Sequence, residues 1–387
     1  MSGLRKYHTK SRNGCTNCKS RRVKCNLHYP QCNNCVRRNE YCSFRRFLWC
    51  SSSKGRSVEE QVEEHIGFNG YLSQGIIPPS ISKRQPSSFP NESVLDTELL
   101  CHFISSCASS LALVPNAQFI WESEIPLHRI DSPFLSQAIM ALSALHISYL
   151  QPPDTLRYDV AARKHFHKAT SQFRSVVREI TNENCISIFG FSLIVVMFQL
   201  RISTDAIAGP LVEDHQCIAG LDVIHALRTA WGLTPSLGPR LMKTRLRGLF
   251  SEGRDLDEQG ILDLNHQEAL SRLEMLNFST VKSESSQIAC VRALSALRYW
   301  CAFMGRRVSI WFHVVWWPAA ITEDFLQLLR NKEPIALAIY SLWLADMRAM
   351  PTKWFTAGWA EGTLALVVDS LELEWRERVE RVLIPVS

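Results

Sequence analysis

Six of the 13 cysteines of this chain lie between Cys15 and Cys42, and the spacing Cys-x2-Cys-x6-Cys occurs there twice. The two thiolates of a Cys-x2-Cys pair can reach one tetrahedral zinc ion, and the third cysteine can return to it after about one helical turn. Two ions need eight ligand positions, which six cysteines supply if two of them bridge both metals. The spacing therefore predicts two Zn²⁺ ions held by Cys15, Cys18, Cys25, Cys32, Cys35 and Cys42.

The twofold repeat limits which cysteines bridge the two metals without identifying them. The bridging pair is Cys15 with Cys32, Cys18 with Cys35, or Cys25 with Cys42. A disulfide knot is the less favoured use of these thiols, because the N-terminal residues MSGLRKYHTKSRNGC lack the apolar stretch of a secretory signal. A metal store with a basic surface is the other alternative.

Positive charge is concentrated around the cysteines. Residues 1–46 contain 12 Lys or Arg and one acidic residue, Glu40, a net charge of +11, whereas the whole chain carries +6. The remaining residues therefore carry −5. This asymmetry is typical of a region that faces nucleic acid, joined to a nearly neutral body. The cations also have a second role, since they help to keep the thiolates deprotonated.

The segment between Cys18 and Cys25 combines cations with a fixed position. It reads Lys19-Ser20-Arg21-Arg22-Val23-Lys24, and we expect one or two helical turns held at both ends by zinc ligands. Arginine can pair with guanine O6 and N7 in the major groove, whereas lysine neutralises phosphates. For each cation the alternative is a solvated face or an electrostatic partner of the cluster.

The stretch from His8 to Phe44, HTKSRNGCTNCKSRRVKCNLHYPQCNNCVRRNEYCSF, resembles the fungal binuclear zinc cluster (Zn2Cys6) transcription factors. In that family the first and fourth cysteines bridge, which by resemblance selects Cys15 and Cys32. The family's loop proline is present as Pro30. Asn26 stands where the family often has Asp, a departure that leaves metal binding untouched.

The resemblance also implies how the cluster would read double-stranded DNA. In the family a short helix enters the major groove over a CGG-type triplet, and the positions that face the bases correspond to Arg21 and Arg22. Of these two residues, Arg22 is the one that we expect first to contact the bases. The other cations then contact phosphates and fix orientation; they are Lys19, Lys24, Arg37 and Arg38.

Composition divides the chain into three parts. Residues 47–92 are punctuated by Ser, Gly and Pro, which favours a flexible linker between a DNA-binding domain (1–46) and a regulatory domain (93–387). The one periodic piece of the linker, Val58-x3-Val62-x3-Ile66, is too short for a coiled coil. Monomeric DNA binding and a homodimer formed through the C-terminal region both remain open.

Residues 93–387 show the spacing of amphipathic helices and predict an all-α domain. Apolar residues recur at three and four from Leu95 to Leu111, with Asp96 as a cap, and Ser132-Pro133 opens a helix ending at Leu150. Further helices are expected over 154–180, 185–200, 221–231, 267–278, 285–303, 322–329, 334–350 and 362–382. Only Val308–Trp317 is β-rich.

The longest apolar run, Cys185–Leu200, contains 16 residues. A bilayer span takes about 20, so a buried helix is expected here and no membrane contact.

This region resembles, less specifically, the regulatory domains of the sterol uptake control subgroup of zinc cluster factors. The similar stretches are LDTELLCHF (95–103), SQAIMALSALH (136–146) and KEPIALAIYSLWLADM with the following PTKWFTAGW (332–359). The resemblance implies a helical domain with an apolar ligand pocket and an activation surface. Six tryptophans fit such a pocket or an ordinary core: Trp311, Trp316, Trp317, Trp343, Trp354 and Trp359.

Catalytic patterns are missing from the sequence. It has no P-loop, no Gly-x-Gly-x-x-Gly, no His-Glu-x-x-His and no Gly-x-Ser-x-Gly. Asp255-x-Asp257 begins like a calcium loop, but His266 occupies the twelfth position, which needs Glu. The sequence thus predicts a nuclear DNA-binding transcription regulator that contacts the transcription machinery, and no enzyme. A protein-binding co-regulator and a metal-handling protein are the alternatives.

Overall fold

The structure is a computed structural model, and it describes residues 16–25, 32–38, 92–112, 117–150, 155–208, 219–247, 262–304, 311–349 and 352–383. Among these residues every regular element is a helix and none is a strand. Two short helices, α1 (Thr16–Ser20) and α2 (Asn33–Val36), form what we call the head. The described residues from Glu92 onward form the body, in which the predicted all-α fold is confirmed.

The body consists of three groups of helices along the chain. The first contains α5 (Glu92–His102), the π-helical turn η1 (Phe103–Cys107), α6 (Ala108–Leu111), the π-helical turn η3 (Ile120–Glu124), α7 (Ile125–His128), α8 (Pro133–Leu150) and α9 (Thr155–Val176). The second contains α10 (Cys185–Ala208), α11 (Ala219–Gly232) and α12 (Thr234–Leu241). The third contains α14 (Leu264–Thr280), α15 (Glu284–Met304), α16 (Trp311–Ala320), α17 (Glu323–Arg330), α18 (Pro334–Met347), α19 (Trp359–Asp369) and α20 (Leu373–Leu383).

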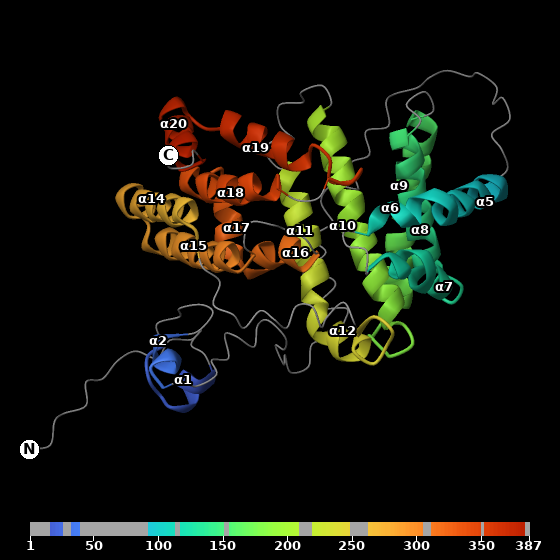
Figure 1. Cartoon of the computed structure of the whole chain (residues 1–387), viewed down its shortest axis with the longest axis horizontal. Coiled ribbons are helices and arrows are strands. Elements are labelled where there is room, and N and C mark those ends of the chain that lie inside the picture. Colours follow the sequence, from blue (N-terminus) through green and yellow to red (C-terminus); the bar gives the residue numbers. More distant parts are fainter. Residues whose placement is uncertain are drawn as a thin grey trace, which may run out of the picture.

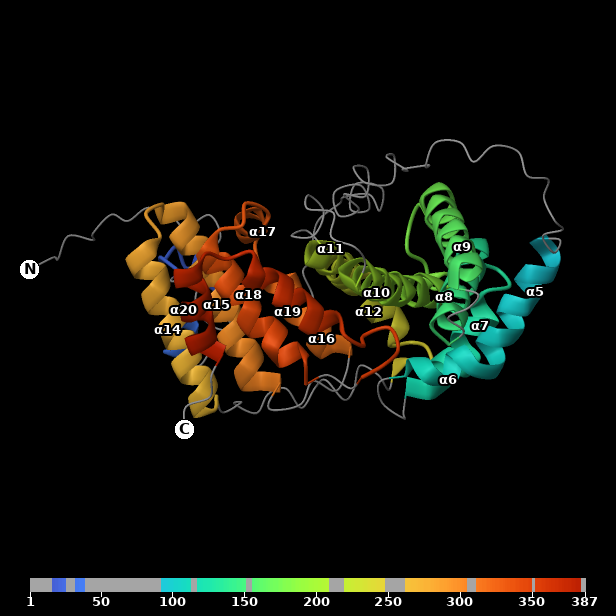
Figure 2. The same ribbon diagram turned by 90° about the horizontal axis from the view of Figure 1, so that it is seen from above.

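Helix α10 lies between the first and third groups (Figure 1). It packs against α8 on one side, and against α11 and α19 on the other. Helix α11 in turn packs against α16, so the pair α10 and α11 connects the two outer groups, as the view from above also shows (Figure 2). The core of the body is therefore continuous from α5 to α20.

The sequence of α10 explains why this helix is buried along its length. Its apolar residues surround the helix axis. The hydroxyl of Ser187 accepts a hydrogen bond from the Ser132 hydroxyl at 2.7 Å. Ser192 donates to the carbonyl of Phe189 within the helix. The buried hydroxyls thus have partners, as burial requires.

Two helices are long and apolar enough to cross a membrane by length and composition alone, Pro133–Leu150 and Cys185–Ile207. In the structure 78% and 72% of these windows are buried against other helices. Such burial is what core helices of a protein show, and it confirms the expected buried helix from Cys185 onward.

Aromatic rings fill the third group. Trp317 stacks on Trp343 with ring centroids 5.2 Å apart, and Trp343 meets Trp359 edge to face at 6.0 Å. The Trp317 indole N–H donates to the carbonyl of Ala293 on α15 at 3.2 Å. Trp316 and Trp354 are also buried. These five tryptophans are core residues, the second of the two uses that the sequence allowed, whereas the side chain of Trp311 lies outside the described residues.

Three sequence predictions about helices are wrong. Asp96 is no cap, because α5 begins at Glu92 and Asp96 lies inside it, 3.5 Å from His165 Nε2. The β-rich stretch that ends at Trp317 is helical from Trp311, since its large side chains pack between α11 and α15. The single helix expected over 362–382 is two helices, α19 and α20.

The break between α19 and α20 has a local cause. The backbone turns at Ser370 and Leu371, where the Leu371 N–H donates to the carbonyl of Val368 at 3.1 Å. The Arg376 Nε then donates to the carbonyl of Leu371 at 2.8 Å and satisfies the end of α19. An apolar periodicity that continues across such a turn gives no sign of it.

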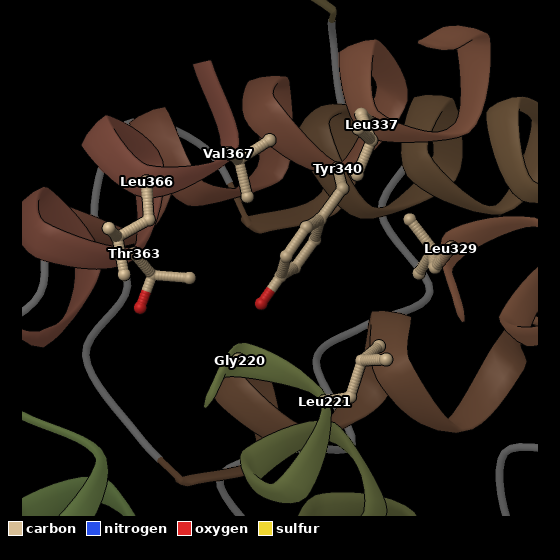
Figure 3. A pocket seen from close by; sticks show the side chains of 8 residues that line it. All are labelled: Gly220, Leu221, Leu329, Leu337, Tyr340, Thr363, Leu366 and Val367. Atoms are coloured by element: carbon tan, nitrogen blue, oxygen red, sulfur yellow. The ribbon is translucent and has the colours of Figure 1, made fainter. Parts of the chain in front are cut away.

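One close approach between helices requires a glycine. A Cβ added to Gly220 on α11 would lie 2.6 Å from the Tyr340 hydroxyl and 2.8 Å from Thr363 Cγ2. Figure 3 shows these two side chains pointing toward the first turn of α11. Both belong to the buried interior, where neighbouring atoms yield little.

We expect Gly220→Ala to lower the free energy of unfolding by about 1–3 kcal/mol, because the methyl group overpacks this contact. The matched control is Gly238→Ala on α12, where an added Cβ meets nothing within 4 Å. In a helix that change is neutral or stabilising. Urea unfolding of the three proteins tests this, and equal midpoints for Gly220→Ala and wild type would contradict it.

Two histidines form a partly buried pair between the end of α5 and α8. His102 Nε2 lies 3.0 Å from His146 Nδ1, and the ring of His146 lies 4.9 Å from that of Trp354. Burial, and then the neighbouring His102, lower the pKa of His146 from 6.5 to about 4. The folded chain therefore resists a proton that the unfolded chain accepts.

This difference makes stability depend on pH in one direction. The contribution of His146 is complete above pH 6.5 and is lost as the pH falls toward 4. We expect His146→Gln to reduce the fall in melting temperature across this range. His167→Gln, which changes an exposed histidine of α9, should leave the fall as in wild type. Identical pH profiles for all three proteins would rule out a role for His146.

Candidate metal centre and nucleic-acid interface

The two halves of the head repeat one local structure. Helix α1 begins directly after Cys15 and contains Cys18, while α2 begins directly after Cys32 and contains Cys35. Cys32 has the extended backbone of a helix N-cap, with φ −68° and ψ 149°. In the second repeat, which the structure describes, the pair Cys32 and Cys35 thus spans the first turn of α2.

Four of the six predicted zinc ligands lie in the described residues, and all four are buried: Cys18, Cys25, Cys32 and Cys35. Cys15 and Cys42 lie outside the described residues. The Sγ atoms of Cys18 and Cys32 are 3.5 Å apart, and those of Cys18, Cys25 and Cys32 lie within 4.8 Å of one another. Three thiols from both repeats therefore converge on one position.

Helix α1 ends in a tight turn that carries Arg22. The Arg22 N–H donates to the carbonyl of Lys19 at 3.1 Å, and the Val23 N–H donates to the carbonyl of Cys18 at 3.0 Å. These two bonds define a Schellman turn, in which the residue after the helix takes a left-handed backbone. Arg22 accordingly has φ +56°. The backbone carbonyl of Cys18, a predicted zinc ligand, thus accepts one of the two hydrogen bonds that define the turn.

The basic segment is arranged differently from the sequence prediction. The helix expected within residues 19–24 instead covers Thr16–Ser20, and Arg21 and Arg22 belong to the turn after it. The reason is the cysteine spacing, since the Cys-x2-Cys pair starts the helix and the return to Cys25 requires the chain to reverse. The cations are therefore presented from the carboxyl end of α1.

Arg21 and Arg22 point in different directions. The Arg21 guanidinium donates from Nη2 to Cys35 Sγ at 3.5 Å and from Nε to the carbonyl of Asn17 at 3.0 Å. Arg22, in contrast, is exposed. Lys19, Lys24, Arg37 and Arg38 are exposed as well. Among the described residues of the head, one arginine is therefore directed toward a cysteine sulfur and five cations are exposed to solvent.

Asn34 lies against the predicted metal centre and was not singled out from the sequence. Its Nδ2 donates to the carbonyl of Lys24 at 2.8 Å and lies 3.8 Å from Cys18 Sγ. It thereby ties α2 to the end of the basic segment. Its place between two cysteines was the available signal, because a polar side chain there must lie close to the metal.

Comparisons with known families cover both parts of the chain. Residues 13–48 match the fungal Zn(2)-Cys(6) binuclear cluster domain, and residues 98–234 match the fungal specific transcription factor domain. The chain carries a Zn2Cys6 cluster domain followed by a fungal transcription factor domain. Both matched families belong to fungal DNA-binding transcription regulators, and the two matches point to a non-enzymatic regulator.

Three relatives agree with this assignment. The Zn(2)-C6 fungal-type transcription factor afumD of Aspergillus fumigatus is 26% identical over 50% of this chain and 47% of its own length. A Zn(2)-C6 fungal-type transcription factor of Gibberella zeae is 24% identical over 97% of this chain and 86% of its own length. Sterol uptake control protein 2 of Saccharomyces cerevisiae is 34% identical, but over only 22% of this chain and 9% of its own length.

The limited overlap with sterol uptake control protein 2 makes that resemblance partial. The described tryptophans lie in the core, and the cavity shown in Figure 3 is lined by aliphatic residues, Gly220, Thr363 and Tyr340. Its volume is about 10 Å³, room for roughly one water molecule. Burial raises the pKa of the Tyr340 phenol, which therefore stays neutral there.

The contact between Arg21 and Cys35 yields a prediction about metal binding. We expect Arg21→Ala to weaken zinc binding by about tenfold, because a partner of the ligand sulfurs is lost. Lys19→Ala removes an exposed cation of α1 and should leave zinc affinity unchanged. Competition of the full-length protein with a chromogenic zinc chelator measures both. Equal affinities for the two variants would assign Arg21 no part in the metal centre.

Proposed function

We propose that this protein is a sequence-specific regulator that reads a CGG-type triplet through Arg22. The observation that carries the proposal is the position of Arg22, exposed at the end of α1 on a turn whose backbone is bonded to Cys18. A zinc ligand and a base-reading side chain are then four residues apart and joined by main-chain hydrogen bonds. Arginine suits this role, since its planar guanidinium pairs with both guanine O6 and N7.

The other exposed cations support the same binding mode. Lys19 and Lys24 flank the turn, and Arg37 and Arg38 follow α2 in the second half. We assign them to phosphates, where they fix the orientation of the head and make affinity depend on salt. Arg21, expected from the resemblance to face bases, is better assigned to the cluster, because its guanidinium bonds to Cys35 Sγ.

Two zinc ions, bridged by Cys15 and Cys32, are the metal content that we propose for the head. Cys32 belongs to the second repeat, yet its sulfur groups with those of Cys18 and Cys25 from the first. A shared Cys32 accounts for this grouping. Bridging by Cys18 with Cys35 would not bring Cys25 and Cys32 to one ion, and bridging by Cys25 with Cys42 would not bring Cys18 and Cys32 to one ion. The structure therefore supports the bridging pair that the resemblance implied.

The wider function follows by analogy with the relatives. We propose a nuclear activator of RNA polymerase II transcription at a metabolic or secondary-metabolite gene set. Its domains would be the DNA-binding head (1–46), a linker (47–92) and the helical regulatory domain (93–387). Two further predictions stay untested. The protein would form a homodimer through the body, and the body would bind an apolar ligand. A ligand larger than water would have to open the cavity of Figure 3.

Selection of duplexes from random DNA tests the proposal with the full-length protein. We expect enrichment of a CGG-type triplet that a strong zinc chelator abolishes. One enriched triplet would indicate a monomer, and two at fixed spacing a dimer. Binding without enrichment would instead indicate a co-regulator that contacts DNA through charge alone.

Two substitutions of Arg22 separate the contribution of its side chain to DNA binding from that of its backbone conformation. Arg22→Gly removes the side chain and suits the left-handed φ of +56°, whereas Arg22→Ala removes the side chain and keeps the strain. We expect both to weaken binding to the selected site by about 1–3 kcal/mol while binding to random DNA changes less. The control Lys24→Ala should weaken both alike. Wild-type selectivity in Arg22→Gly would show that Arg22 matters only for the turn.

A further inference from the structure

A second group of metal-ligating side chains lies in the body, where α14, α15 and α18 pack together. One atom each of His266, Cys301 and Asp346 lies within 4.8 Å of the other two. His266 is near the start of α14, while Cys301 and Asp346 are near the ends of α15 and α18. The sequence analysis considered His266 only as the twelfth position of a calcium-like loop, so the fold alone brings the three side chains together.

The distances suit a tetrahedral zinc ion. Cys301 Sγ lies 3.6 Å from Asp346 Oδ2, and His266 Nε2 lies 2.9 Å from Asp346 Oδ1. Ligand atoms around tetrahedral zinc are separated by about 3.3–3.6 Å, given bonds of about 2.0 Å to nitrogen or oxygen and 2.3 Å to sulfur. The pair of Cys301 Sγ and Asp346 Oδ2 already has this separation, whereas His266 Nε2 contacts the other carboxylate oxygen, Oδ1. The imidazole and the carboxylate would have to part by less than about 1 Å.

Asp263 contacts the second ring nitrogen of His266, Nδ1. Its Oδ2 lies 2.8 Å from His266 Nδ1, and its Oδ1 accepts from the His266 backbone N–H at 3.0 Å as the N-cap of α14. A carboxylate on one ring nitrogen directs the other nitrogen toward a metal and fixes the tautomer, as in many zinc proteins. Here Nε2 is directed toward Asp346 and Cys301.

We propose that Cys301, His266 and Asp346 bind one Zn²⁺ ion, with Asp263 orienting His266 and the fourth position left to water. The donor set of thiolate, imidazole and carboxylate favours zinc over magnesium or calcium, which prefer oxygen ligands alone. The ion would fasten the ends of α14, α15 and α18 to one another. It is separate from the six cysteines of the head in both sequence and ligand type.

Access and charge fit this assignment. Cys301 is buried, while the side chains of His266 and Asp346 are 22% and 21% exposed, so an ion can enter from solvent. A thiolate and one carboxylate balance the charge of Zn²⁺, with the imidazole neutral. The thiol must lose its proton when zinc enters, so binding releases protons.

The zinc content of purified full-length protein tests the proposal. We expect Cys301→Ala to contain one zinc ion per chain fewer than wild type. Cys290→Ala is the matched control, because it removes the same atoms from a buried position of the same helix, outside the group of ligands. The readout is a difference between variants, so it does not depend on how many ions the head holds. Equal zinc content in Cys301→Ala and wild type would overturn the proposal.

Asp346→Asn keeps the result interpretable if Cys301→Ala does not fold. The amide has the shape of the carboxylate but is a poor zinc ligand, so this variant should also lose one ion while its circular dichroism stays helical. Zinc added to wild type stripped of metal should raise the melting temperature of the body, and should raise it less in Asp346→Asn. A wild-type zinc content in Asp346→Asn would mean that the four side chains form only a hydrogen-bonded network.

Discussion

Metal ligation takes the place of a hydrophobic core in the head, and its other features depend on it. The buried side chains of the described head residues are cysteines, and α1 and α2 are too short to persist by themselves. Zinc therefore has to provide the free energy that packing provides elsewhere. The turn that carries Arg22 is bonded to the carbonyl of Cys18, one of the proposed zinc ligands, so the position of Arg22 is tied to the metal centre.

The body follows the opposite principle, because apolar burial decides its structure. Helix α10 is enclosed by α8, α11 and α19, and its few hydroxyls find partners nearby. Polar groups in this core are placed where geometry satisfies them, as with the Trp317 indole on the carbonyl of Ala293. The head and the body thus carry separate tasks: one presents charge to DNA, and the other provides a stable scaffold for regulation.

Much of this could be predicted from the sequence, and the failures have physical reasons. The zinc cluster domain follows from the cysteine spacing, because two Cys-x2-Cys-x6-Cys repeats have few other uses, and long helices such as α8 and α15 follow from periodicity. The ends of α1 could not be predicted, because the turn after Ser20 depends on how the chain reverses to bring Cys25 to the other cysteines. The orientation of Arg21 could not be predicted either, because its partner Cys35 lies in the other repeat.

Residues far apart in the sequence were the hardest to connect. His266, Cys301 and Asp346 lie on three helices, and nothing in their individual surroundings indicates a shared site. The π-helical turns η1 and η3 were likewise invisible, because their i→i+5 bonding leaves no periodic signature of its own.

The hydrogen bond from Val23 to the Cys18 carbonyl has a thermodynamic consequence. It links the metal centre to the turn that carries Arg22, so the two binding events share one backbone conformation. Linkage is reciprocal: the factor by which zinc strengthens DNA binding is also the factor by which DNA strengthens zinc binding. A head docked on its site would therefore retain zinc against cellular competitors that could strip the free protein, and occupancy of the genome would itself protect the regulator's metal.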